Sequence, residues 1–408
     1  MGREERRPLR VLAVDDSAVM RGVLKTVFDL HASQGDLSLP RMELCGLVRD
    51  GVEALEAVQT LAPDVVLLDL EMPRMNGLEV LQKLRIMAPK LPVIMCSAYT
   101  ERGARSTLDA LSAGAKDYVM KPGQQKDFAS ALDMLMEQLL PKIAALSGWG
   151  LVRSETQQRL QEPTRVRQNT AMERGDAEPT ATRSFGTGGR LVELVVIGVS
   201  TGGPSALEVM LPMLAKDFAV PILIVQHMPR LFTGALAERL DRICRMPVQQ
   251  ARDGARIGAG EIWLAPGDAH MEVVHGVGPR RAGAFNPVVK LHQGPPLNSC
   301  RPAVDYLFRS AATMYGAGTL ALLMTGMGSD GFDGAKAVRA AGGTVLAQDE
   351  ASSAVWGMPG RVAKEGVANA VVALQGLASA LMTRVAEGRG GKRMASTAAP
   401  HEVIYGVL

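Results

Sequence analysis

The stretch LVELVVIGVSTGGPSALEVML, residues 191–211, runs from an apolar strand pattern through a glycine-rich turn into a helical pattern. A strand that leads directly into a helix is the repeating unit of an α/β fold. Within it, GVSTG (198–202) fits the pattern G-x-S-x-G, whose small residues permit a tight turn that exposes the hydroxyl of Ser200. Backbone N–H groups at the start of the helix would stabilise negative charge there. The motif alone leaves a phosphate-binding or dinucleotide-binding loop open, although it lacks G-x-G-x-x-G spacing and a P-loop lysine.

Two later segments offer partners for that serine. His227 directly follows the apolar pattern in PILIVQHMPR (221–230). Asp330 lies in a glycine-rich loop after another apolar run in LALLMTGMGSDG (320–331). Strands of a parallel sheet end at one edge, so nucleophile, base and orienting carboxylate can meet there, as a serine hydrolase requires. The chain order Ser, His, Asp differs from that of α/β-hydrolases and indicates a separate solution on a doubly wound sheet.

Residues 9–146 repeat the alternation of strand and helix patterns. Five short apolar runs are flanked by turn residues, namely LRVLAV (9–14), MELCGLV (42–48), DVVLLDL (64–70), LPVIMCS (91–97) and KDYVM (116–120). Amphipathic stretches separate them, and in residues 17–30 one helical face carries Val19, Met20, Val23, Leu24, Val27 and Phe28. Five strands alternating with helices predict a parallel, doubly wound sheet whose ligands bind beyond the carboxyl ends of the strands.

Chemically reactive residues sit at those ends. Asp15 and Asp16 close the first strand, and Asp69 closes the third. Ser97 closes the fourth strand and Lys121 the fifth. Carboxylates of this kind suit Mg²⁺, which binds through a few carboxylates, water and phosphate oxygens. In that arrangement Asp69 would accept a phosphoryl group, Lys121 would pair with the phosphoryl oxygens and Ser97 would hydrogen-bond to them. Taken singly, each acidic residue could equally cap a helix or a turn.

Together these segments resemble the receiver domain of two-component response regulators, over residues 9–125. The resemblance is carried by VDDS (14–17), LLDLEMPRMNGLEVL (67–81), MCSAYT (95–100) and GAKDYVMKP (114–122). It implies a flavodoxin-like fold and phosphorylation of Asp69. It also implies Mg²⁺ held by Asp16 and Asp69, by Asp15 through water and by the backbone carbonyl of Glu71. Tyr118 occupies the switch aromatic position, and with Ser97 it would report phosphorylation to the surface near Tyr99.

Residues 192–385 resemble the chemotaxis protein-glutamate methylesterase family, CheB. The resemblance is carried by IGVSTGGP (197–204), VQHMP (225–229), WLAPGDAHM (263–271), NSCRPAVDYLFRSAA (298–312), LLMTGMGSDG (322–331) and QDEASSAVWGMPGRVAKEG (348–366). It implies that Ser200 is the nucleophile, His227 the general base and acid, and Asp330 the carboxylate that orients the imidazole. Backbone N–H groups of Thr201 and Met327 would hold the oxyanion.

The implied substrate is a glutamate γ-methyl ester on the cytoplasmic helices of a chemoreceptor, which would be hydrolysed to glutamate and methanol. The same attack would deamidate glutamine to glutamate, because both reactions are acyl transfers through a tetrahedral intermediate. The resemblance implies no cofactor for this esterase half. In NSCRP, Cys300 stands where the family pattern N-x-H-R-P has histidine, while Arg301 is retained as a candidate substrate contact. We expect Cys300 to alter contacts with the substrate while catalysis persists.

The length of 408 residues predicts two domains, because single cores stop growing near about 250 to 300 residues. Hydrophobic periodicity fades between the halves, where Arg, Glu, Gln, Thr and Gly predominate, as in a flexible tether. The predicted division is an N-terminal extension (1–8), a receiver domain (9–146), a flexible linker (147–189), a doubly wound parallel-sheet esterase domain (190–386) and a loose C-terminal tail (387–408).

Composition narrows the partners and the compartment. The net charge of +3 gives no broad basic field for nucleic acid. No segment approaches the about 20 apolar residues of a membrane span, and the N-terminus lacks the apolar stretch of a signal peptide. The four cysteines have no zinc or CxxC spacing, which favours free thiols in a reducing compartment. We therefore expect a cytoplasmic monomer without membrane insertion.

The domain order suggests that the receiver covers the esterase mouth until Asp69 is phosphorylated by a chemotaxis-type histidine kinase. The rival hypothesis is a non-catalytic, phosphorylation-controlled adaptor that only binds chemoreceptors, which retention of the serine, histidine and aspartate disfavours. A DNA-binding output is disfavoured by the long, apolar second half, which shows no basic recognition helix. A dehydrogenase would need a proper glycine fingerprint followed by an acidic residue about 20 positions later.

Overall fold

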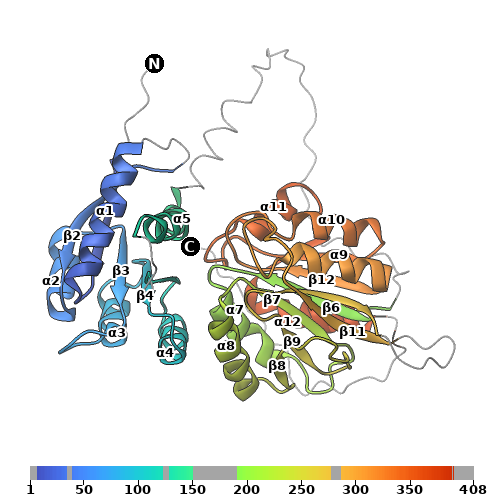
Figure 1. The fold of residues 1–408 in the computed structure, drawn as a ribbon. Coiled ribbons are helices and arrows are strands. Elements are labelled where there is room, and N and C mark those ends of the chain that lie inside the picture. The colour runs from blue at the N-terminus through green and yellow to red at the C-terminus, as the bar shows by residue number, and fades with distance from the viewer. Residues whose placement is uncertain are drawn as a thin grey trace, which may run out of the picture.

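The structure is a computed structural model that describes residues 7–34, 39–122, 128–149, 191–276, 286–387 and residue 389. It contains two α/β bodies, coloured blue to teal and green to red in Figure 1. The predicted N-terminal extension, linker and C-terminal tail lie almost wholly outside the described residues.

The first body is a parallel sheet with strand order β2-β1-β3-β4-β5, which confirms the predicted doubly wound arrangement. Its strands are β1 (Leu9–Val14), β2 (Met42–Val48), β3 (Val65–Asp69), β4 (Val93–Ser97) and β5 (Asp117–Met120). Its helices are α1 (Ala18–Gln34), α2 (Gly51–Leu61), α3 (Gly77–Met87), α4 (Glu101–Ser112) and α5 (Phe128–Leu146). Apolar side chains of α1 and α5 cover one face of the sheet, and those of α2, α3 and α4 cover the other.

The predicted apolar face of α1 is correct except at its start. Met20, Val23, Leu24, Val27 and Phe28 are all buried against the sheet. Val19, in contrast, is 77% exposed. It is the second residue of α1 and is absent from the apolar cluster that the other five residues join, so the prediction was wrong for this residue.

The second body is built on a seven-stranded parallel sheet of order β14-β13-β12-β6-β7-β9-β8. Its strands are β6 (Leu194–Val199), β7 (Ile222–Gln226), β8 (Val248–Gln250), β9 (Ile262–Leu264), β12 (Thr319–Leu323), β13 (Thr344–Gln348) and β14 (Ala370–Val372). An antiparallel pair of β10 (His270–His275) and β11 (Pro287–His292) lies outside this sheet and was not anticipated from the sequence.

Helices cover both faces of the seven-stranded sheet. They are α7 (Gly203–Met210), α8 (Arg230–Ile243), α9 (Val304–Tyr315), α10 (Phe332–Ala340), α11 (Met358–Lys364) and α12 (Leu374–Ala386), with short 3-10 turns at η1 (Leu211–Met213) and η2 (Gly316–Gly318). Residues of α7, α8 and α12 pack on one face, and those of α9, α10 and α11 on the other. Among the described helices, none combines the length and apolar character that a membrane span needs.

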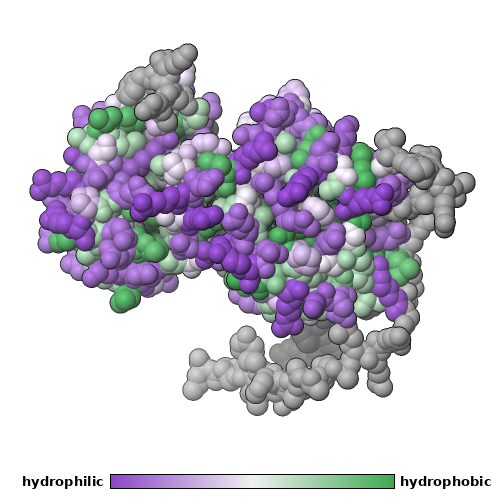
Figure 2. Space-filling view, turned by 60° about the horizontal axis from the view of Figure 1, so that its bottom comes forward, coloured by the Kyte–Doolittle hydropathy of each residue, from purple (hydrophilic) through white to green (hydrophobic). Residues whose placement is uncertain are grey.

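The two bodies meet where α4 packs against α7 and α8, as can be followed in Figure 1. Arg239 of α8 donates to Asp109 Oδ1 at 2.5 Å and to Ser112 Oγ at 2.9 Å, both on α4. The ring of Tyr118 stacks on Phe232 with centroids 4.8 Å apart and planes 4° from parallel. Figure 2 shows the two lobes in contact, with hydrophilic residues over most of this face. The receiver-type sheet is therefore joined to the second body by a mixed polar and aromatic contact.

Candidate active site and phosphoacceptor site

Ser200 lies immediately after β6, at the carboxyl edge of the larger sheet. Its backbone N–H donates to Thr325 O at 3.0 Å, and its carbonyl accepts from Gly203 N at 2.8 Å and Gln226 Nε2 at 3.0 Å. The turn requires Gly202, whose φ is +75° and whose place a Cβ would share with Ala354 Cβ at 2.5 Å. This tight turn presents a half-buried serine at the start of α7, as the G-x-S-x-G pattern predicts.

His227 and Asp330 flank that serine from the neighbouring strands. His227 follows β7 and Asp330 follows β12, and both strands pair directly with β6. His227 Nε2 lies 2.8 Å from Asp330 Oδ2. Of the three residues predicted as a triad, His227 and Asp330 are therefore in direct contact. Ser200 follows β6, which lies between the strands that precede those two residues.

Asp330 is buried and fully engaged by donors. Its Oδ2 accepts from the backbone N–H of Val304 at 2.7 Å, in the first turn of α9. Its Oδ1 accepts from Asp305 N at 3.2 Å, Gly331 N at 2.9 Å and Asn298 Nδ2 at 3.2 Å. A helix N-terminus favours negative charge, so these donors fix the carboxylate in its ionised form facing the imidazole.

The charges of this pair reinforce each other. Burial of His227 lowers its pKa, but the hydrogen bond to Asp330 and the adjacent Cys300 outweigh burial and raise the pKa to about 10. Burial raises the pKa of Asp330, but His227 and the backbone donors outweigh burial and lower that pKa below its usual range. This arrangement favours the protonated imidazole against its carboxylate.

The second imidazole nitrogen, Nδ1, is not hydrogen-bonded to the serine hydroxyl in the described residues. Instead Cys300 Sγ lies 3.6 Å from Nδ1. Catalytic hydrogen bonds are often long or absent before substrate binds, so this geometry is compatible with a site at rest. Sequence reasoning expected Cys300 on the substrate side, whereas the structure places it on the imidazole.

Of the two residues predicted to form an oxyanion hole, Thr201 follows Ser200 directly, and Met327 follows a glycine that lies against the serine. Gly326, which precedes Met327, approaches the serine so closely that a Cβ on it would meet Ser200 Cβ at 2.8 Å. Thr201 directly follows the serine and is buried, and its hydroxyl donates to Asp117 Oδ2 of the first body at 2.8 Å. The residue that follows Ser200 is thus hydrogen-bonded to the first body.

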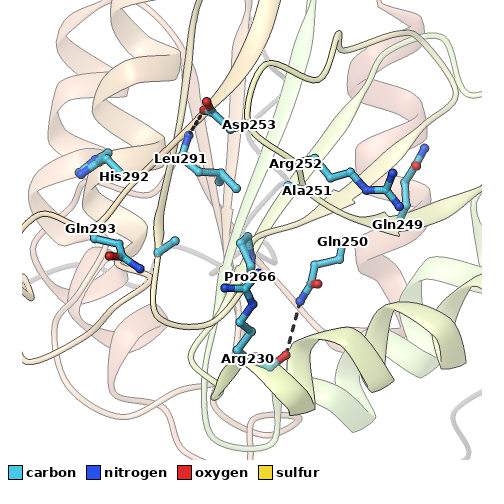
Figure 3. A pocket seen from close by; sticks show the side chains of 11 residues that line it. Arg230, Gln249, Gln250, Ala251, Arg252, Asp253, Pro266, Leu291, His292 and Gln293 are labelled. Atoms are coloured by element: carbon cyan, nitrogen blue, oxygen red, sulfur yellow. Dashed lines mark hydrogen bonds between the residues drawn. The ribbon is translucent and has the colours of Figure 1, made fainter.

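A polar cavity of about 590 Å³ is lined in part by Arg230, which lies three residues after His227 in the sequence. Figure 3 shows the side chains that line it, among them Arg252, Gln250 and Gln293. Arg301, the candidate substrate contact, lies outside this lining and donates to Gly294 O at 3.3 Å. The cavity offers amide and guanidinium groups, which can hydrogen-bond to a polar ligand.

The smaller sheet gathers its predicted site residues at one edge. Asp15 and Asp69 are buried, Asp16 is exposed, and carboxylate oxygens of the three lie within 4.8 Å of one another. Lys121 Nζ lies 2.8 Å from Asp15 Oδ2 and 2.7 Å from Asp69 Oδ2. The N–H of Glu71 points at Asp69 Oδ1 at 3.4 Å. The convergence expected from the strand ends is therefore present.

This donor set fits a hard divalent cation. Burial raises the pKa of Asp69 to about 6, with a further rise from the charge of Asp15, although Lys121 opposes both. Burial lowers the pKa of Lys121, but its two carboxylate partners outweigh burial and raise it. Three oxygen ligands with one shared ammonium leave excess negative charge, which Mg²⁺ with its preference for carboxylates and water would neutralise.

Ser97 and Tyr118, the predicted phosphoryl-sensing residues, are both turned toward neighbouring structure. Thr107 Oγ1 of α4 donates to Ser97 Oγ at 2.7 Å. Tyr118 is buried against Phe232, and burial raises its pKa well above the usual value. Tyr99 is 51% exposed and lines a surface hollow together with Lys121 and Pro229. Ser97 is therefore joined to α4, and Tyr118 contacts α8 of the second body directly.

Two family models match the chain in this order. The response regulator receiver domain matches residues 11–133, and the CheB methylesterase domain matches residues 195–381. With the two sheets and their edge sites, these matches define a response regulator whose output domain is an ester hydrolase.

Similar proteins extend the match over nearly the whole chain. A protein of Trichodesmium erythraeum (strain IMS101) named protein-glutamate methylesterase/protein-glutamine glutaminase is 41% identical over 376 residues, covering 92% of this chain and 99% of that protein. A protein-glutamate methylesterase/protein-glutamine glutaminase 2 of Caulobacter vibrioides (strain ATCC 19089 / CIP 103742 / CB 15) is 41% identical with the same coverage. The chain belongs to the CheB methylesterase family.

Among solved structures, the CheB methylesterase catalytic domain of Thermotoga maritima is 40% identical. It covers 47% of this chain and 97% of that chain, with a TM-score of 0.44.

Proposed function

We propose that this chain is a phosphorylation-controlled protein-glutamate methylesterase in which Ser200, His227 and Asp330 carry the hydrolysis. The observation that carries the proposal is the 2.8 Å contact between His227 Nε2 and Asp330 Oδ2. This contact lies at the sheet edge where Ser200 follows β6, the strand that pairs with both β7 and β12. Membership of the CheB family supports a glutamate γ-methyl ester as the substrate, and the names of the relatives support glutamine deamidation as a second activity.

We propose that Nδ1 of His227 acts as the base, because Asp330 engages Nε2. Only Nδ1 of His227 is left to accept the proton of Ser200 while the hydroxyl oxygen attacks the ester carbonyl carbon. Backbone N–H groups of Thr201 and Met327 would receive the oxyanion. The tetrahedral intermediate expels methanol, which takes the proton from Nδ1, and leaves an acyl-serine.

The second half of the reaction uses the same groups in reverse. Water attacks the acyl-serine while Nδ1 of His227 accepts its proton, and collapse returns that proton to Ser200 and releases glutamate. With glutamine as substrate, ammonia leaves in place of methanol. Asp330 remains ionised throughout and stabilises the imidazolium. Its two oxygens are held by the imidazole and by four further donors, from Asn298, Val304, Asp305 and Gly331.

A receiver domain implies Mg²⁺-dependent phosphorylation, which we place on Asp69. The ion would be held by carboxylates of Asp15, Asp16 and Asp69 and by the carbonyl of Glu71, and when bound it neutralises charge on the transferred phosphoryl group. Lys121, already within 2.7 Å of Asp69, would pair with the phosphoryl oxygens. A phosphoryl oxygen would also attract Ser97 Oγ away from Thr107.

We propose that this movement opens the esterase. Ser97 is tied to α4 through Thr107, and α4 forms the main contact with α7 and α8. On β5, Asp117 accepts a hydrogen bond from Thr201, the residue after Ser200. The neighbouring Tyr118 stacks on Phe232 of α8. Release of α4 and β5 would therefore free the loop that carries Ser200 for the receptor substrate. Weakening the contact between the two bodies by about 1.4 kcal/mol would raise the open-to-closed ratio tenfold.

By its family, the protein acts on chemoreceptors and receives its phosphoryl group from a kinase, which we propose is a histidine kinase of the chemotaxis type acting on a cytoplasmic monomer. The test is methanol release from methylated receptor membranes by wild type and Ser200→Ala. We expect release by wild type and none above background with Ser200→Ala. If Ser200→Ala releases methanol, the catalytic assignment is wrong; if folded wild type releases none with phosphodonor and Mg²⁺ present, receptor binding without catalysis is the better account.

A further inference from the structure

Cys300 completes a second nucleophile, base and carboxylate series around the same imidazole. Its Sγ lies 3.6 Å from His227 Nδ1, and Nε2 of that ring lies 2.8 Å from Asp330 Oδ2. The sulfur, a ring nitrogen and a carboxylate oxygen all lie within 4.8 Å of one another. A thiol beside an imidazole that is itself oriented by a carboxylate is the arrangement of nucleophile, base and orienting group found in nucleophilic catalysis.

The position of the thiol is fixed by a tight turn. Leu297 and Cys300 exchange two backbone hydrogen bonds of 2.9 and 3.1 Å, and the two residues between them have positive φ. The amide of Asn298 in this turn donates to Asp330 Oδ1 at 3.2 Å and to Asp305 Oδ2 at 3.1 Å. The carboxylate that orients the imidazole is thus also anchored to the turn that carries the sulfur.

The other three cysteines lack this environment. Burial raises the pKa of Cys96 and of Cys244 to about 12, and it also raises the pKa of Cys45. In the described part of the chain none of these three thiols is hydrogen-bonded to a histidine. Cys300 is half-buried, so solvent reaches it beside the imidazole. One of four free thiols is therefore both accessible and paired with a base.

We propose that Cys300 is an oxidisable modification site, at which a hydroperoxide converts the thiol to a sulfenic acid and withdraws His227 from ester hydrolysis. When the His227 ring is neutral, the proton of the thiol passes to Nδ1, and the sulfur attacks one peroxide oxygen. The S–O bond forms as the O–O bond breaks, and the leaving oxygen takes the proton from Nδ1 to become water or an alcohol. Sulfur is oxidised by two electrons and the peroxide is reduced by two.

The effect on hydrolysis rests on the proposed function of His227. Nδ1 is the nitrogen left for Ser200, and the added oxygen on Cys300 would sit against it. Ester hydrolysis then stops until a thiol reductant restores the site. Two reductant thiols become a disulfide, and the sulfenic oxygen leaves as water.

The first arm of the test measures modification without using esterase activity. Full-length protein is treated with hydrogen peroxide and dimedone in the presence of a chelator, and labelling of each cysteine is followed by peptide mass spectrometry. We expect Cys300 to be labelled at least about tenfold faster than Cys45 or Cys244, and His227→Gln to slow labelling of Cys300 by about the same factor. Equal rates at the three cysteines in wild type would overturn the proposal.

The second arm measures methanol release, with each variant normalised to its own untreated rate. Peroxide should inactivate wild type and Cys244→Ser alike, and dithiothreitol should restore both. Cys300→Ser should resist the same treatment. If Cys300→Ser is inactivated as fast as wild type, Cys300 does not control the imidazole. A failure of the esterase assignment would leave the labelling result unchanged, so the two hypotheses fail separately.

Discussion

Replacement of Asp117 by alanine should activate the unphosphorylated enzyme. The substitution removes the carboxylate that accepts the Thr201 hydroxyl at 2.8 Å, and both side chains are buried where the two bodies meet. A buried hydrogen bond to a charged group contributes about 1.5 to 3 kcal/mol, and its loss leaves Thr201 without that acceptor only in the closed form. The open-to-closed ratio should therefore rise about 10- to 150-fold.

The assay is methanol release from methylated receptor membranes without phosphodonor. Activity of Asp117→Ala should approach, and not exceed, the rate that phosphodonor gives to wild type. A matched control is Asp109→Ala, which removes an ion pair with Arg239 whose aspartate side chain is 53% exposed. Exposed pairs contribute about 0.2 to 1 kcal/mol, so this control should gain at most about fivefold. Wild-type basal activity in Asp117→Ala, with activation by phosphodonor intact, would refute the reasoning.

Three further predictions concern the same two sites. Asp330→Asn should lower methanol release about 10⁴-fold with the circular dichroism spectrum unchanged, because the imidazole loses its orienting charge; a loss below tenfold would contradict this role. Thr107→Val should lower the phosphodonor concentration for half-maximal activation about fivefold. The substitution removes the hydrogen bond of about 1 kcal/mol between Thr107 and Ser97, which would compete with the phosphoryl group for Ser97. An unchanged dose response would contradict this. In the pH–rate profile of the full chain, activity should rise with pH toward about 10, because the base His227 must lose a proton before it can act. Cys300→Ser should move that rise to lower pH, and an unmoved profile would show that the sulfur does not raise the pKa.

The sequence was sufficient for features that depend on strand ends. Apolar runs placed Asp69 and Ser97 at one sheet edge and His227 and Asp330 at another, because parallel strands share the direction in which they end. Motif spacing also located the turn at Ser200. Catalytic, phosphorylation and oxyanion roles for these residues stay predictions.

Contacts that depend on turns or on domain packing could not be read from the sequence. Asn298 reaches Asp330 because the turn before Cys300 reverses the chain, and no local pattern encodes where that turn docks. The bond between Asp117 and Thr201 joins residues 84 positions apart on two separately folded sheets. Val19 shows a smaller limit of the same kind, because helical periodicity does not reveal which turn of a helix packs against the core.

The central claim is that phosphorylation of Asp69 releases a serine esterase. The most direct measurement is the initial rate of methanol release from methylated receptor membranes, with and without Mg²⁺ and a small phosphodonor, for wild type, Asp69→Asn and Ser200→Ala. The account predicts that phosphodonor accelerates wild type only in the presence of Mg²⁺, that Asp69→Asn stays at the basal rate, and that Ser200→Ala releases nothing. Acceleration of Asp69→Asn equal to that of wild type would contradict it.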